Sequence, residues 1–136
     1  MDAAIATALS LTESSTLEQR TVDITTHGAR SRQPRRIEIW FHNVDGDVYI
    51  TGTPGARSWY ANLLANPEFT FHLKHDVHAD LPATATPVTD SEDRSAVFAA
   101  ILDGIDAFYA GRSSRPAFAP LETWIADSPL VRVSFN

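Results

Sequence analysis

Four arginines gather in one short segment that has no acidic residue. Arg30, Arg32, Arg35 and Arg36 fall within residues 27–36, between two segments with the alternation of strands. Guanidinium groups and free backbone N–H groups in such a bend wrap anions. Each charge-assisted hydrogen bond to the anion contributes on the order of 1.5–3 kcal/mol. The segment therefore predicts a site for a phosphorylated cofactor, and a solvated basic loop is the alternative interpretation.

A second segment with candidate binding residues begins at the end of a later predicted strand. Thr51, Gly52 and Thr53 end that strand, and Gly52 would let a flat ligand approach the backbone closely. Trp59 and Asn62 follow on a short predicted helix, three residues apart and so on one side of it. The alternative interpretation makes Trp59 a core residue and Asn62 a stabiliser of the turn.

These two segments are positioned by strands, which alternating apolar and polar residues predict along most of the chain. Asp45 and Gly46 supply a hairpin turn between two of these strands. One further predicted strand carries Pro82 and Pro87, so we expect it at a sheet edge or with a bulge. The predicted strands are residues 21–26, 36–42, 47–52, 69–74, 79–88 and 131–135.

Helical signals are fewer. Apolar residues recur at helical spacing over residues 90–110, with a capping box at Thr89 and Glu92 and a stop at Gly111. A shorter helix over residues 58–65 must end before Pro67. Residues 1–17 form an N-terminal helix or a flexible segment. The pattern predicts one domain over residues 1–136, mainly β with helices (α+β), built as a small antiparallel barrel.

Composition excludes several classes of function. The 136 residues carry a formal charge of −6 and no cysteine, which excludes disulfides, thiolate nucleophiles and Cys-containing metal sites. His72, His75 and His78 are three residues apart on an extended segment, so they do not converge on a metal. Overall acidity argues against nucleic acid, and no apolar stretch is long enough for a membrane helix. Because no export signal is visible, we expect a cytoplasmic protein.

The order of the motifs resembles the deazaflavin-dependent nitroreductase family. Members of that family are split β-barrel oxidoreductases, related to FMN-binding barrels, that use coenzyme F420, an 8-hydroxy-5-deazaflavin. The resemblance is strongest over about residues 22–90 and predicts the split β-barrel fold. The motifs that carry it are Gly28, Arg30-Ser31, Gln33-Pro34-Arg35, Thr51-Gly52-Thr53 and Trp59-Tyr60-x-Asn62-Leu63-x-Ala65-Asn66-Pro67.

The resemblance implies roles for individual positions. The family's loop for the cofactor phosphate and acidic tail falls on residues 28–35, and its strand end beneath the deazaflavin ring falls on residues 51–53. The implied cofactor contacts are Arg30, Ser31, Arg32, Gln33, Pro34, Arg35, Ile37, Thr51, Gly52, Thr53, Trp59 and Asn62. The expected substrate pocket is formed by Glu38, Trp40, Tyr60 and Phe118.

Two positions depart from the family pattern. Arg32 stands where the family usually has glycine, and a left-handed backbone there would cost a non-glycine residue roughly 1–2 kcal/mol. Pro54 replaces a lysine of the nitroimidazole-reducing members and offers neither a cation nor an N–H donor.

The resemblance implies an F420-dependent oxidoreductase, similar to nitroreductases and quinone reductases, that moves a hydride from the reduced cofactor to a quinone, enone or nitro compound. Glu38, His42 or Tyr60 could relay a proton, and no catalytic side chain is required. FMN is the alternative cofactor, because its single phosphate also suits the arginine loop. A non-catalytic carrier of a flavin-like or fatty ligand is the second alternative. Split-barrel relatives often pair, so a homodimer is a further expectation.

Overall fold

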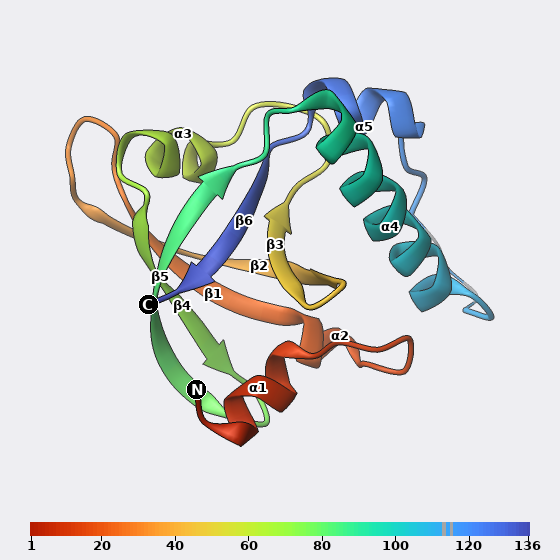
Figure 1. Ribbon diagram of the computed structural model, residues 1–136, viewed down its shortest axis with the longest axis horizontal. Helices are drawn as coiled ribbons and strands as arrows, with labels where there is room; N and C mark the ends of the chain where they lie inside the picture. The colour runs from red at the N-terminus through yellow and green to blue at the C-terminus, as the bar shows by residue number, and fades with distance from the viewer. Residues whose placement is uncertain (113, 115) are drawn as a thin grey trace.

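Six antiparallel strands close into a barrel in this computed structural model, which describes residues 1–112, 114 and 116–136. Their order around the barrel is β1-β2-β3-β6-β5-β4, as Figure 1 shows. The predicted antiparallel barrel with helices is thus confirmed. The strands are β1 (Thr21–His27), β2 (Pro34–Val44), β3 (Asp47–Thr51), β4 (Glu68–Lys74), β5 (His78–Pro87) and β6 (Leu130–Phe135).

Tight turns set the register of the strands. Asp45 and Gly46 join β2 to β3 with φ angles of 52° and 90°, the left-handed pair that an Asp-Gly hairpin turn requires. Asn43 supports this turn by accepting a hydrogen bond from the N–H of Gly46 at 3.1 Å. The barrel closes through pairings between residues far apart in sequence, β1 with β4 and β3 with β6.

The expectation that the proline-containing strand lies at an edge or contains a bulge is wrong, because β5 pairs with β4 on one side and β6 on the other, in an unbroken register on both sides. The prolines are accommodated where the pairing is incomplete. The register with β6 begins at Ala83, beyond Pro82, and Pro87 is the last residue of β5. The carbonyl of Pro82 accepts a hydrogen bond from the terminal Asn136 N–H, so its missing N–H falls where β6 ends.

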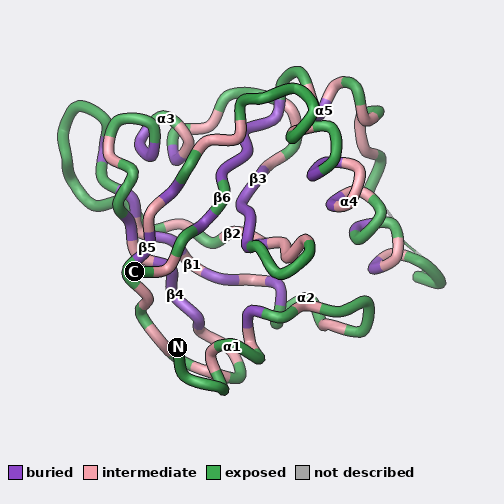
Figure 2. Tube along the Cα trace, viewed as in Figure 1, coloured by how far each residue is buried: buried purple, intermediate pink, exposed green. Residues whose placement is uncertain are grey.

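The barrel interior is the main hydrophobic core (Figure 2). Ile24, Phe41, Ile50 and Phe71 are fully buried there, and Phe41 and Phe71 meet edge to face with ring centroids 5.5 Å apart. The alternation that predicted the strands reflects this burial. The outward residues Asp23 and Thr25 of β1 and Arg36 and Glu38 of β2 are instead polar, and they matter for the distribution of charge described below.

A second core lies outside the barrel, where α4 (Ser91–Tyr109) and α5 (Leu121–Asp127) pack against each other beside β3 and β6. Phe98 and Trp124 are buried between them. Helix α4 begins one residue later than the capping box predicted, because the side chain of Asp90, rather than Thr89, accepts the Asp93 N–H at 3.0 Å.

Three further helices lie at the ends of the barrel. Helix α3 (Ser58–Ala65) has the predicted bounds and stops at Asn66, before proline. Helix α1 (Ala3–Leu9) and the four-residue α2 (Leu17–Arg20) lie near the start of β1. Within the described part of the chain, no helix combines the length and the hydropathy needed to cross a membrane.

Candidate functional site

The arginine segment forms the hairpin loop between β1 and β2. The Gly28 N–H donates to the Gln33 carbonyl and the Arg32 N–H donates to the Gly28 carbonyl, both at 2.9 Å. Ser31 Oγ accepts the Gln33 N–H at 3.2 Å. A Cβ on Gly28 would overlap Ser31 Oγ, so glycine is required for this tight packing. The loop is a closed, hydrogen-bonded turn rather than an extended strap.

The loop presents unused donors to solvent. Residues 29–36 are exposed, and within the described chain no acceptor is recorded for the N–H groups of Arg30 and Ser31. The guanidinium groups of Arg30 and Arg32 have no recorded partner there either, and that of Arg35 contacts only the Pro34 carbonyl at 3.4 Å. Adjacent backbone N–H groups with cations nearby in the chain are a donor set that binds anions. The donor set fits a phosphate with an acidic tail.

Arg32 adopts the left-handed backbone that was considered for this position from the sequence, with φ of 58°. The loop therefore keeps the turn for which the family uses glycine, at a strain of roughly 1–2 kcal/mol. Arg32 adds a guanidinium to a loop that already carries Arg30, so this departure from the family pattern increases the positive charge of the loop.

Asn62 holds the loop against α3. Its Oδ1 accepts the Ala29 N–H at 3.0 Å, and its Nδ2 donates to Thr26 Oγ1 at 3.2 Å, while Asn62 itself is 8% exposed. Asn66 adds longer contacts from its Nδ2 to the carbonyls of His27 and Gly28. The amide of Asn62 is thus occupied by protein partners, which makes it a residue that positions the loop.

The end of β3 is fixed from both sides. The Thr51 hydroxyl donates to the Pro129 carbonyl, and the Gly55 N–H donates to the Asp127 carbonyl at 3.0 Å. Thr51 is buried, whereas Thr53 is exposed. The backbone at Gly52 and Gly55, where φ of Gly55 is 134°, carries no side chain of its own. This strand end is a rigid platform next to α3.

Arg57 occupies the platform, and the sequence analysis did not single it out. Its Nη2 donates to Thr53 Oγ1 at 2.7 Å and to the Thr53 carbonyl at 2.9 Å. The guanidinium is so close to Gly52 and Gly55 that a Cβ on either would contact it. All recorded partners are neutral oxygens, so the platform carries an uncompensated positive charge. In the sequence, the one indication of this role is that a single arginine stands between a glycine turn and the start of a helix.

Two other predicted cofactor residues belong largely to the core. Trp59 is 7% exposed and is part of the barrel cluster, and Ile37 packs against the same cluster opposite Ile24. Pro34 begins β2 opposite His27. These three residues position the loop and the platform from beneath.

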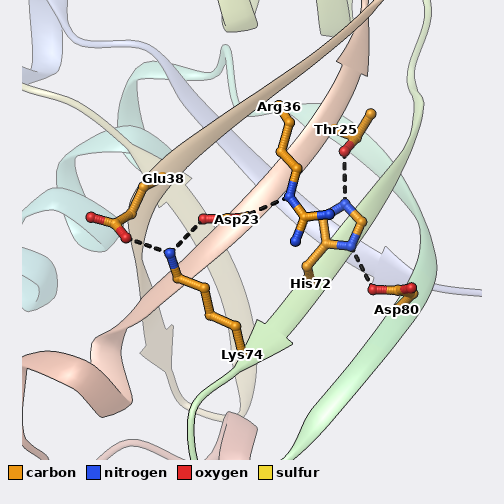
Figure 3. A network of polar contacts seen from close by, with 7 residues as sticks. All are labelled: Asp23, Thr25, Arg36, Glu38, His72, Lys74 and Asp80. Carbon is orange, nitrogen blue, oxygen red and sulfur yellow. Dashed lines mark hydrogen bonds and ion pairs between the residues drawn. The ribbon is translucent and has the colours of Figure 1, made fainter.

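Glu38, expected in the substrate pocket, lies on the outer face of the barrel in a charged network (Figure 3). Lys74 bridges Glu38 and Asp23, and Arg36 donates to Asp23 at 2.9 Å. Although burial alone would raise the pKa of Asp23, the hydrogen bonds from Lys74 and Arg36 hold it below its ordinary value. Glu38 and Arg36 are therefore occupied by ion pairs.

His72 continues this outer face. Its Nε2 lies 2.7 Å from Thr25 Oγ1 and its Nδ1 lies 2.6 Å from Asp80 Oδ1 (Figure 3). The hydrogen bond from His72 lowers the pKa of Asp80. Among the described residues, no group of three or more His, Cys, Asp or Glu side chains could hold a metal.

The other expected substrate residues are dispersed. Trp40 meets the ring of Phe108 edge to face at 5.2 Å, and Phe118 packs between Tyr109 and Trp124. His42 lies in a cleft of about 250 Å³ beside α4. Burial and the nearby charge of Arg20 lower the pKa of His42 to about 4.

Tyr60 alone among the four expected substrate residues lines a cavity next to the platform. This open cavity of about 750 Å³, here called the α3–α5 cavity, lies between residues 54–56, Tyr60, the start of α4 and residues 126–129. Thr89, Arg94 and Ser128 are among the residues that line it. The Arg94 guanidinium donates to the backbone carbonyls of Val88, Ile125, Trp124 and Ser128.

Comparison with known proteins adds a family match. The model of the F420H(2)-dependent quinone reductase family matches residues 3–117. That span includes the arginine loop, the platform and α3, and covers well over half of the chain.

Solved structures share the fold. A conserved hypothetical protein, Rv2991, from Mycobacterium tuberculosis superposes with a TM-score of 0.63 at 19% identity, covering 100% of this chain and 81% of that one. An F420-H2 dependent reductase, FDR-A, gives 0.54 at 20% identity, with 85% and 94% coverage. An FAD-binding protein from Mesorhizobium loti gives 0.61 at 11% identity, with 100% and 91% coverage.

Proposed function

The chain belongs to the F420H(2)-dependent quinone reductase family, an oxidoreductase family that uses coenzyme F420, and on this premise we propose its acceptors and the residues that hold its cofactor. The proposed reaction moves a hydride from reduced F420 to a small quinone, enone or nitro compound. When bound, the cofactor supplies the hydride from carbon 5 of its deazaflavin ring. The protein supplies position and exclusion of water.

The arginine loop is the single observation that carries this proposal. Arg30 and Arg32 offer guanidinium groups without recorded partners in the described chain, and the Arg35 guanidinium has only the Pro34 carbonyl at 3.4 Å. The N–H groups of Arg30 and Ser31 have no recorded acceptor there either. A cofactor with a phosphate and an acidic tail satisfies several of these donors at once. FMN would satisfy fewer, because it ends at a single phosphate.

The platform at the end of β3 is the proposed contact for the deazaflavin ring. The Arg57 guanidinium covers Gly52 and Gly55, so a ring bound at the platform would contact this guanidinium, a cation that Pro54 cannot supply. That charge favours the negative charge of the reduced ring. Trp59 and Asn62 act from beneath, by fixing α3 and the loop.

The first experiment is a fluorescence titration of the cofactor-free protein with oxidised F420 and, separately, with FMN, at low and moderate salt. Tight F420 binding that weakens as salt rises is expected, because the contacts are ionic. Preference for FMN, or binding independent of salt, would contradict the proposed role of the arginine loop.

Arg57 is tested by replacement with alanine and with lysine. Arg57→Ala should weaken binding of reduced F420 about tenfold, because a charge-assisted contact is lost. Arg57→Lys should retain part of the affinity. Exposed Arg132 on β6 is the matched control, since Arg132→Ala removes the same charge away from the platform. Equal affinities for Arg57→Ala and the parent protein would remove Arg57 from the site.

Pairing into a homodimer and a cytoplasmic location stay predictions. Light scattering on the purified protein over a range of concentrations measures the mass of the particle. A mass of two chains at micromolar concentration is the expected result for the dimer, and the mass of one chain would contradict it.

A further inference from the structure

A cleft between α4 and the last residues of β2 holds an arginine that has no acidic partner. Arg20, at the end of α2, is 7% exposed and lines this cleft of about 250 Å³, here called the β2–α4 cleft. Its Nε and Nη2 donate to the carbonyls of Ser15 and Thr12 at 3.1 and 2.8 Å. Its Nη1 has no recorded partner among the described residues. Arginine is almost never buried unless its charge is paired, so this exception calls for an explanation.

The free nitrogen of Arg20 can be reached by a ligand. Among the described residues, only Ser128 has a fully buried side-chain polar atom without a partner, so Nη1 of Arg20 retains accessible surface. No ion pair is recorded for Arg20 in that part of the chain. The charge of its guanidinium is therefore available to an anion that enters the cleft.

A second arginine adds to the positive charge. The guanidinium carbons of Arg20 and Arg112 lie 4.8 and 4.2 Å from the centre of the Phe108 ring. Burial and the nearby charge of Arg112 lower the pKa of Arg20. Because no described carboxylate forms a recorded ion pair with either arginine, their repulsion is uncompensated, and a bound anion would relieve it.

His42 brings a neutral donor to the same cleft. It shares one face of β2 with Trp40, which meets the Phe108 ring of α4, and with Val44, which packs against the second core. Burial and the charge of Arg20 lower the pKa of His42 to about 4, so at pH 7 its imidazole is uncharged and has one N–H donor. Within the described chain neither ring nitrogen has a recorded partner, and neither is fully buried.

Glycine leaves space on the helix side of the cleft. Gly104 lies inside α4, where glycine weakens a helix relative to alanine. The fold does not require glycine here, because its φ is not positive and an added Cβ would meet no described atom within 4 Å. Gly104 lines the β2–α4 cleft. The space beside it is thus open to a ligand.

We propose that the β2–α4 cleft binds a small monocarboxylate with a short apolar body, such as a branched short-chain acid. The carboxylate accepts hydrogen bonds from Arg20 Nη1 and the His42 N–H. The cleft is smaller than the roughly 300–1,000 Å³ of pockets for drug-sized ligands, so the acid is small. Apolar residues line the walls and receive its body: Leu11, Val44, Ala100 and Ile101.

Glu13 limits the charge of the acid. This exposed residue also lines the cleft, and it forms no recorded ion pair with Arg20 in the described chain. A second carboxylate on the ligand would lie near that of Glu13 and be repelled. The surroundings therefore favour one negative charge over two.

The β2–α4 cleft is separate from the arginine loop. Arg20 directly precedes β1, and the loop follows the other end of that strand (Figure 1). His42 likewise lies near the end of β2 that is far from the loop. The inference goes beyond the proposed function and does not rest on it, so F420 affinity is an independent control.

The first test measures binding of sodium isobutyrate to the ¹⁵N-labelled protein by amide shifts, with sodium chloride at equal ionic strength as the control. Saturable shifts are expected at residues 11–13, 42–44 and 100–104. Sodium malonate, which carries two carboxylates, should bind more weakly. Absence of saturable shifts there, equal shifts with chloride, or malonate binding as tight as isobutyrate would each overturn the proposal.

Gly104→Leu fills the cleft without removing a recorded contact. It should weaken isobutyrate binding at least fivefold, while the unfolding midpoint stays equal or rises, because leucine forms helices better than glycine. Ala96→Leu is the matched control, since it adds the same side chain at an exposed position of α4 outside the cleft. F420 affinity should stay unchanged in both. Unchanged isobutyrate affinity in Gly104→Leu would overturn the site.

Two further variants test the charges. Arg20→Met should weaken isobutyrate binding about tenfold or more, and Glu13→Gln should strengthen it about two- to fivefold. Arg20→Met also loses its bonds to two carbonyls, so its unfolding midpoint is measured first, and Gly104→Leu decides the proposal if that variant does not fold. Full affinity in folded Arg20→Met, or weaker binding in Glu13→Gln, would overturn the assigned contacts.

Discussion

Arg35 and Arg36 are neighbours in sequence, yet they lie in two different electrostatic regions. Arg35 lies at the exposed start of β2, next to the loop, and its guanidinium contacts only the Pro34 carbonyl. The guanidinium groups of Arg30 and Arg32 in the loop lack recorded partners in the described chain. Arg36 points to the outer barrel face and pairs with Asp23, next to Lys74. Alternation along β2 separates the two side chains.

The difference teaches that charge density alone does not define a binding site. On the barrel face, the strand register places Asp23 opposite Glu38 and beside Thr25, so each cation there finds a carboxylate. In the loop, the amides of Asn62 and Asn66 form hydrogen bonds with the backbone and not with the arginine side chains. Only in the loop is the positive charge of the arginines available to a ligand.

The largest expected effect comes from removing the free charges. Arg30→Ala combined with Arg35→Ala should weaken F420 binding at least a hundredfold, because each charge-assisted bond is worth on the order of 1.5–3 kcal/mol. Arg36→Ala is the matched control and should change F420 affinity less than threefold. Fluorescence titration measures all three proteins. If Arg36→Ala lost as much F420 affinity as the double variant, the arginine loop and the outer barrel face would not differ in their role in binding.

Replacement of Asn62 tests how the arginine loop is held in place. Asn62→Ala leaves the Ala29 N–H and Thr26 hydroxyl without their partner and should lower the free energy of unfolding by about 1–3 kcal/mol. Urea unfolding measures this, with Asn66→Ala as a control of smaller effect because its contacts are longer. F420 affinity should fall with stability. Full stability together with lost affinity would instead make Asn62 a direct cofactor contact.

Replacement of Asp23 tests the ion-paired region on the outer face of the barrel. Asp23→Asn should lower stability at pH 7 by about 0.5–1 kcal/mol, a value typical of exposed ion-pair networks. The pKa of Asp23 is lowered in the folded state, so its pairing stabilises the fold above the ordinary carboxyl pKa and is lost as pH falls through the lowered value.

The variant should therefore lose less stability than the parent as pH falls below the ordinary carboxyl pKa of 3.8. Thermal unfolding across this range measures the difference. F420 affinity should be unchanged, and a drop in affinity would place the cofactor on the barrel face.

Local patterns predicted most of the elements. Residues 58–65 form the expected helix because proline ends it, and Asp45-Gly46 forms the expected turn. The seven-residue α5 and the four-residue α2 were not predicted, because such short helices show too little periodicity. Closure of the barrel depends on pairing between distant strands, which no local pattern encodes, and so β5 has no free edge.

The residues of the candidate site likewise divide into those that local sequence patterns revealed and those that depend on contacts between distant segments. The arginine loop was visible in sequence because its residues are contiguous. Arg57 was missed, because its place on the platform depends on the turn of the chain at Gly52 and Gly55. Glu38 was assigned to a pocket since nothing local revealed that the register brings Lys74 to it.

The smallest expected effect concerns the strained arginine of the loop. Arg32→Gly relieves the left-handed backbone strain but gains flexibility in the unfolded chain, so stability should rise by about 0.5–1 kcal/mol. Arg32→Ala keeps the strain and should leave stability unchanged. If the charge of Arg32 serves the cofactor, both variants should weaken F420 binding equally, by tenfold or less. If only Arg32→Gly weakens F420 binding, the loop requires a rigid turn at this position rather than a third positive charge.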